Sequence, residues 1–137
     1  MKPIALLLFV CTTLCLAKTR ENTTNAGCPV SIHKVNLNTA YSPEFRMFYA
    51  NTSQKTMLGT KFAVDVMDPT GDYVPSSHVA DTQKLGPHKG SAPLFRFESL
   101  NRRPSGLRIY LIKAAFDDGT TWEDDGTMAC RIVEDYR

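Results

Sequence analysis

The sequence predicts an all-β protein folded as an antiparallel β-sandwich. Three observations predict this class: short segments in which apolar and polar residues alternate, turn residues that divide these segments, and the lack of any stretch with sustained helical periodicity. Only a turn around residues 77–81 has some helical character. About six to eight short strands in roughly 110 residues suit a sandwich, and a small closed barrel is the alternative.

The strands of the first half are marked by their alternation and their aromatic content. Apolar residues recur over 30–37 with a shift in phase, which predicts a bulged first strand. Segment 45–49 is aromatic and prone to form a strand. Segment 61–67 alternates cleanly, so its inward residues are predicted to be Phe62, Val64 and Val66, and its outward residues Lys61 and Asp65. The stretch 68–72, with Pro69 and Gly71, then predicts a turn.

The second half repeats this pattern. Segment 94–98 alternates, and segment 107–116 is the longest apolar stretch, which predicts a central strand. Asp118-Gly119 indicates a tight reversal into a short strand at 120–123. Asp125-Gly126 marks a further turn before the last predicted strand, which covers 128–133.

The N-terminus reads as a secretory signal peptide. Lys2 precedes a short apolar run, and Ala17 closes it before a polar stretch. We therefore expect a signal peptide at 1–17, a flexible mature N-terminus at 18–27 and one β-sandwich domain at 28–137. After the leader no stretch is apolar and long enough to span a membrane, so the mature chain is expected to be soluble and secreted or periplasmic.

Cysteine positions support export. Cys11 and Cys15 lie in the leader, so cleavage leaves only Cys28 and Cys130, near the two ends of the domain. We expect them to form a structural disulfide in an oxidising compartment. Without Lys2 the chain has 16 − 1 = 15 basic and 14 acidic residues. A net charge this close to zero gives no electrostatic argument for binding nucleic acid.

Several residue types could carry chemistry, but none forms a recognised motif. His33, His78 and His88 are not spaced as metal ligands, and the methionines at 47, 57, 67 and 128 are expected to pack in the core. The acidic stretches 117–119 and 123–126 are expected to form turns rather than a calcium loop. No nucleophile, zinc or phosphate-loop motif occurs, so we expect no enzyme and no cofactor.

Two sequons bear on the source of the protein. Asn22 and Asn51 are both followed by the pattern that N-glycosylation requires. Both would be acceptors in a eukaryotic secretory pathway and would mean nothing in a bacterium. Asn51 is expected at the point where the second strand ends in a polar turn.

The order of features from Phe45 to Trp122 resembles small exported bacterial domains of the FxLYD-like, immunoglobulin-like kind. The residues that carry the resemblance are the runs 47–53, 62–71, 85–90 and 115–122, although the Phe-x-Leu-Tyr-Asp string itself is absent. This resemblance implies an immunoglobulin-like sandwich that serves as an extracytoplasmic binding or accessory module.

We therefore predict a secreted or periplasmic, non-enzymatic binding module whose partner is a protein or a component of the cell envelope. Loops 51–60 and 72–93 are the expected recognition surface, because long loops on a rigid sandwich often carry recognition. The candidate contact residues are Tyr73, His78, His88 and Trp122, although Trp122 also suits a cross-strand core contact. A copper- or calcium-handling protein and a eukaryotic secreted protein or effector are the alternatives.

Overall fold

The structure, a computed structural model, describes residues 27–39, 42–97 and 103–136. The predicted signal peptide at 1–17, Asn22 and nearly all of the predicted flexible segment 18–27 lie outside these residues. All regular secondary structure within them is β-strand. None of the described segments forms a helix with the length and apolar character that crossing a bilayer requires.

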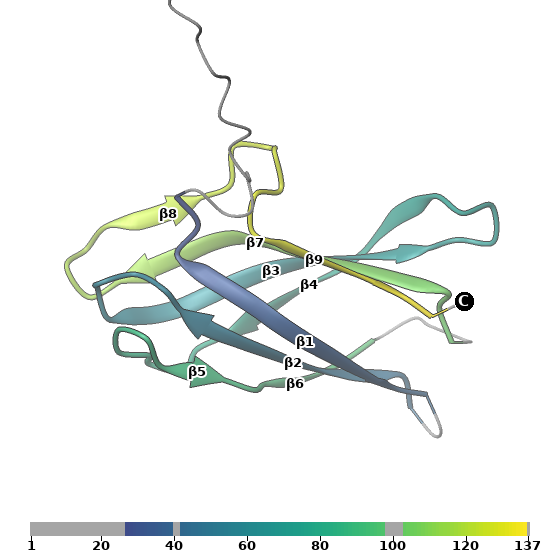
Figure 1. The fold of residues 1–137 in the computed structure, drawn as a ribbon, viewed down its shortest axis with the longest axis horizontal. Helices are drawn as coiled ribbons and strands as arrows, with labels where there is room; N and C mark the ends of the chain where they lie inside the picture. Colours follow the sequence, from purple (N-terminus) through teal and green to yellow (C-terminus); the bar gives the residue numbers. More distant parts are fainter. Residues whose placement is uncertain (1–26, 40–41, 98–102, 137) are drawn as a thin grey trace, which may run out of the picture.

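The strands form two antiparallel sheets. The first sheet has the order β1-β2-β5, with β6 also paired to β2, and contains β1 (Val30–Asn38), β2 (Glu44–Asn51), β5 (Gly90–Ser91) and β6 (Leu94–Arg96). The second has the order β4-β3-β7-β8, with β9 also paired to β7, and contains β3 (Met57–Met67), β4 (Tyr73–Asp81), β7 (Gly106–Phe116), β8 (Thr121–Glu123) and β9 (Arg131–Asp135). Figure 1 shows the two sheets as two layers.

The core lies between these layers and is built from the inward residues of both sheets. Phe45, Met47 and Tyr49 of β2 are fully buried against residues of β3 and β7. The latter are Phe62, Val64, Leu107, Ile109 and Leu111. Neither sheet closes on itself, so the predicted β-sandwich is confirmed and the barrel alternative is wrong.

The topology is immunoglobulin-like. One sheet contains β1, β2, β5 and β6. It faces a second sheet in which β3 and β7 are neighbours and β9 pairs with β7. β4 pairs with β3 instead of crossing to the other sheet. The second sheet is therefore wide, and β3 lies between β4 and β7 along most of its length.

Most of the sequence-based strands are confirmed. β1 has a bulge between Ile32 and Lys34, and β7 is central, because it pairs with β3, β8 and β9. Gly119 adopts a φ of 81° in the turn between β7 and β8, as the Asp-Gly reversal predicts. The helical character expected around 77–81 is wrong: these residues belong to β4, where pairing with β3 outweighs a weak local preference.

The predicted disulfide is also confirmed. Cys28 and Cys130 are bonded, with a Cα–Cα distance of 5.6 Å and a sequence separation of 102 residues. Cys28 lies two residues before β1 in one sheet, and Cys130 lies directly before β9 in the other. The bond therefore ties the two sheets together along the edge where β1 and β9 meet.

Candidate functional site

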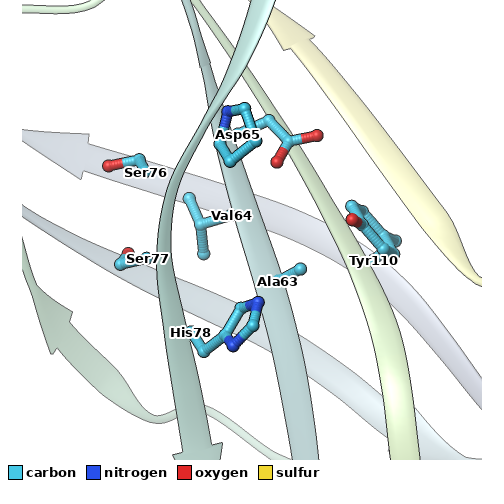
Figure 2. A pocket seen from close by; sticks show the side chains of 8 residues that line it. Ala63, Val64, Asp65, Ser76, Ser77, His78 and Tyr110 are labelled. Atoms are coloured by element: carbon cyan, nitrogen blue, oxygen red, sulfur yellow. The ribbon is translucent and has the colours of Figure 1, made fainter.

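The outer face of the second sheet carries the main candidate site, where side chains from β4, β3 and β7 stand in rows. His78, Ala63 and Tyr110 are register partners and form one row across the three strands. Pro75 and Asp65 continue the next row with Arg108. Figure 2 shows the rings of His78 and Tyr110 on either side of Ala63, with the Asp65 carboxylate at one end.

A depression of about 430 Å³ lies over these rows. Its lining is mixed in polarity and consists of Ala63, Val64, Asp65, Pro75, Ser76, Ser77, His78 and Tyr110. Ala63, one of the lining residues, has a short side chain between the larger His78 and Tyr110. A β-bulge in β4, where Ser76 is the extra residue, also locally interrupts the ladder between β3 and β4. A site of this volume is large enough to hold a small ligand or one side chain of a partner.

An ion pair with a buried carboxylate and a partly exposed guanidinium lies at one end of the depression. Asp65 is only 3% exposed although it points outward from the sheet. Arg108 donates two hydrogen bonds to the same atom, Asp65 Oδ2, one of them from Nε at 2.9 Å. The Arg108 guanidinium also packs on the ring of Tyr73, 4.8 Å from its centroid. Arg108 therefore leans along the sheet toward Tyr73 and away from the row of Ala63.

Burial and nearby charges both affect the pKa of Tyr110. Burial raises the pKa of the Tyr110 hydroxyl, and the negative charge of Asp65 raises it further. The positive charge of Arg108 offsets only part of the effect of Asp65 on that pKa, and Asp124 adds to the increase. The two carboxylates therefore act on the pKa of Tyr110 in the same direction as burial does.

Two further depressions occur on the described surface. One of about 200 Å³ continues along the same face beside Gly59, Ala80 and Ala115. The other, of about 370 Å³, lies on the opposite sheet beside His33 and Phe48. Both are more apolar than the depression at Asp65, and neither has a buried charged side chain at its floor.

The structure brings together only part of the predicted contact set. Tyr73 and His78 lie on β4 and share the outer face with Asp65. Trp122 lies opposite Ala114 on β8 and packs against the core, which favours its cross-strand interpretation. His88 lies in the loop before β5, where its backbone N–H donates to Asn51 O. Neither Trp122 nor His88 borders the depression.

The predicted recognition loops are shorter than expected. Of the range 72–93, residues 73–81 form the edge strand β4, and of the range 51–60, residues 57–60 belong to β3. Ser, Pro and His in 72–80 suggested a loop, yet the edge of a sheet tolerates Pro75 because its missing N–H coincides with a bulge. The tips of these loops are therefore 52–56 and 82–89.

Asn51 lies at the predicted end of β2, but its side chain is fully buried. Its Nδ2 donates to the carbonyl oxygens of Lys55, Leu85 and Gly86 at 2.8–3.1 Å. Its Oδ1 accepts hydrogen bonds from the backbone N–H and the hydroxyl of Ser53. A glycan on Nδ2 has no space in this fold, so Asn51 is a structural residue that joins the two loop tips.

The acidic turns use their carboxylates internally. Asp118 and Asp125 each accept hydrogen bonds from the backbone N–H and hydroxyl of the threonine two residues later. Asp68 does the same with Thr70. These contacts support turn chemistry over calcium binding. Within the described ranges no three His, Cys, Asp or Glu side chains gather as a metal-ligand set, and Met47 and Met57 are fully buried in the core.

Sequence reasoning missed Asp65, Arg108 and Tyr110 as site residues. Asp65 was placed outward correctly, but alternation alone does not show that neighbouring side chains cover an outward residue. The sequence did contain a signal for this site. Asp65 lies in an otherwise apolar strand segment, and Arg108 lies in the longest apolar segment. Their pairing became visible only through the register of β3 and β7.

Comparisons with known proteins describe the fold and no activity. No family model matches the chain, and no curated protein matches it either. One similar solved structure is an X-ray structure of a hypothetical protein from Peptoclostridium difficile 630, with a TM-score of 0.53 and 10% identity over 74% of this chain and 89% of that one. Another is a Northeast Structural Genomics Consortium target, with a TM-score of 0.39 and 9% identity over 77% and 85%. The resemblance to FxLYD-like domains stays a prediction.

Proposed function

We propose that this protein is an exported, non-enzymatic binding module that recognises its partner through the outer face of β4, β3 and β7. The observation that carries the proposal is the depression over Ala63. A solvated sheet face ordinarily carries exposed polar side chains. This face instead has a buried carboxylate paired with Arg108, and the rings of His78 and Tyr110 lie on either side of the short Ala63.

A binding role fits the chemistry of the depression better than catalysis does. Asp65 accepts both of its hydrogen bonds from Arg108, so the pair is arranged to hold a fixed geometry. Export is supported by the signal-peptide pattern of residues 1–17 and by the disulfide between Cys28 and Cys130. The partner is a protein or an envelope component that the exported chain meets outside the cytoplasm.

Capture from an envelope extract of the source cells tests the face. The double variant His78→Ala/Tyr110→Ala removes both rings beside Ala63. The matched control His33→Ala/Phe48→Ala removes one histidine and one aromatic ring from the outer face of the other sheet. Capture should be lost only in the first variant, with unchanged unfolding midpoints in both. Equal capture by the two variants would show that this face is not used.

Export is tested separately by the intact mass of the protein purified from its source, before and after reduction. A chain that begins at Lys18 and gains two hydrogens on reduction supports the proposal. A chain that keeps residues 1–17 contradicts it.

A further inference from the structure

We infer that the outer face of the first sheet binds an acidic polysaccharide, with one sugar ring packed beside Phe48 and its carboxylate held by Arg46 and Lys34. This inference goes beyond the proposed function, because it concerns the opposite sheet and a different class of ligand. Three properties of this face carry it: a depression beside an aromatic ring, two cations next to that ring, and the charge of the face as a whole.

Phe48 is an aromatic residue on a sheet face where polar residues are usual. It lies at an outward position of β2, which runs between β1 and β5 (Figure 1), and its register partner on β1 is Lys34. Phe48 is partly exposed and lines the depression of about 370 Å³ together with the small residues Ala50, Gly90 and Ala92. A hollow of this volume, bordered by an aromatic ring and small side chains, can hold one sugar ring with its C–H face on the aromatic group.

Two cations lie next to this depression. Arg46 Nη1 donates a hydrogen bond of 2.8 Å to the carbonyl oxygen of Ala92, which lines the depression, so the guanidinium lies at its rim. Lys34 is the cross-strand neighbour of Phe48 on the same face. Arg46 and Lys34 are exposed, and within the described part of the chain neither forms an ion pair with a carboxylate. Arg46 therefore keeps most of its N–H donors for a ligand, and a guanidinium binds a carboxylate with two parallel hydrogen bonds.

The charge of the whole face favours an anionic ligand. Its outward residues on β1, β2 and β6 include three cations, Lys34, Arg46 and Arg96, and one carboxylate, Glu44. Glu44 already faces Arg96, with Oε2 3.8 Å from Nε. The net charge of this face is thus 3 − 1 = +2, which equals the formal net charge of the whole chain. A surface of this sign attracts an anionic partner, and the attraction falls as the salt concentration rises.

The form of the face favours a sugar over other anionic partners. Phe48 lines a depression instead of protruding, so it is not placed to insert into a lipid surface. Beside the cations the face offers neutral polar groups, the hydroxyl of Ser31, the imidazole of His33 and the amide of Asn36. Such groups match the hydroxyl groups of a sugar, whereas an acidic peptide needs the cations alone. An aromatic ring, neutral polar groups and a guanidinium together are complementary to a sugar that carries a carboxylate.

The experiment measures the binding of trigalacturonate to the protein with its disulfide intact, through the NMR shifts of the backbone amides of Phe48, Ala50 and Gly90. The methyl ester of trigalacturonate keeps the rings without the charge, and amide-capped triglutamate keeps the carboxylates without the rings. Trigalacturonate should bind with a dissociation constant on the order of 0.1–1 mM, and both controls at least about tenfold more weakly. If trigalacturonate causes no shifts, or if either control binds as tightly as trigalacturonate does, the inference is wrong.

A pair of arginine variants tests the position of the carboxylate. Arg46→Gln keeps an exposed polar side chain and should weaken trigalacturonate binding at least about tenfold at an unchanged unfolding midpoint. Arg96→Gln is the matched control, because Arg96 lies one row beyond Arg46 and faces Glu44, and it should weaken binding less than about threefold. Equal effects of the two variants would indicate attraction by the overall charge alone and would overturn the inference.

The two faces are tested independently of each other. The variant His33→Ala/Phe48→Ala should lose trigalacturonate binding but keep envelope capture through β4, β3 and β7. The variant His78→Ala/Tyr110→Ala should keep trigalacturonate binding. Retained trigalacturonate binding by His33→Ala/Phe48→Ala would overturn this inference and would leave the proposed function as it stands.

Discussion

Asn51 should be the polar residue on which the stability of this fold depends most. Replacing it with alanine removes an amide that donates to three carbonyl groups and an oxygen that accepts two hydrogen bonds from Ser53. The carbonyls of Leu85 and Gly86 keep one donor each, the N–H groups of Met57 and Lys89. The loss is therefore close to the net value of the bonds, about 1 kcal/mol each for the three strongest, plus a small cavity.

We expect Asn51→Ala to lower the free energy of unfolding by about 3 kcal/mol. Urea denaturation measures this as a shift of the midpoint at unchanged slope. Asn36→Ala is the matched control, because Asn36 is exposed on β1, and it should change stability by less than about 0.5 kcal/mol. If the two variants differ by less than about 1 kcal/mol, the buried amide does not have the structural role assigned to it.

Asn51→Asp tests the polarity of the site without a change of volume. A carboxylate here would face three carbonyl oxygens in a fully buried position, so it should destabilise more than alanine at neutral pH. Burial would raise the pKa of the introduced carboxyl group above its unfolded value of about 3.9. The variant should then lose stability as the pH rises above about 4, and wild-type stability at pH 7 would refute the argument.

The burial of Asn51 also decides how its sequon behaves. In a eukaryotic secretory host, folded and secreted protein should carry no glycan at Asn51, because its Nδ2 is enclosed by loops 52–56 and 82–89. Peptide mapping of the secreted protein measures this directly. Full occupancy at Asn51 in folded protein would contradict the packing.

Two further predictions concern the disulfide and one acidic turn. Cys28→Ser/Cys130→Ser should lower stability by up to about 4–5 kcal/mol in the chain-entropy view of a 102-residue loop, measured by urea denaturation. Hydrogen bonds from Thr120 and then Lys55 hold the pKa of Asp118 well below its usual range. This stabilisation is present above the unfolded pKa and is lost as the pH falls. Asp118→Asn should therefore show a smaller loss of stability on acidification, and an unchanged acid limb would argue against these contacts.

Local pattern was sufficient for most of the strands, and the loss of Cys11 and Cys15 with the predicted leader was sufficient for the disulfide. Alternation identified Phe62, Val64 and Val66 as core residues, and all three face the interior. The Asp118-Gly119 pair predicted its hairpin because a positive φ is a local requirement. Features of this kind depend on neighbours in the sequence, so they can be found without knowledge of the fold.

The edge strand β4 and the site could not be found in this way. Residues 73–81 contain Pro75, two serines and a histidine, and only their pairing with β3 makes them a strand. The meeting of Asp65 with Arg108 depends on a register between strands 43 residues apart in sequence. Such contacts depend on which strands pair and in which register, and this pairing cannot be derived from a single sequence.

The desolvation cost of the Asp65–Arg108 ion pair bears on the role of this face. Asp65 and Ala63 occupy outward positions of β3, yet they are only 3% and 2% exposed. The Asp65 carboxylate is largely removed from water, and Arg108 compensates it through two hydrogen bonds that both end on Oδ2. Buried ion pairs contribute little net stability compared with apolar replacements of similar volume. The pair at Asp65 is therefore better explained by the fixed geometry that it gives to this face than by a gain in stability.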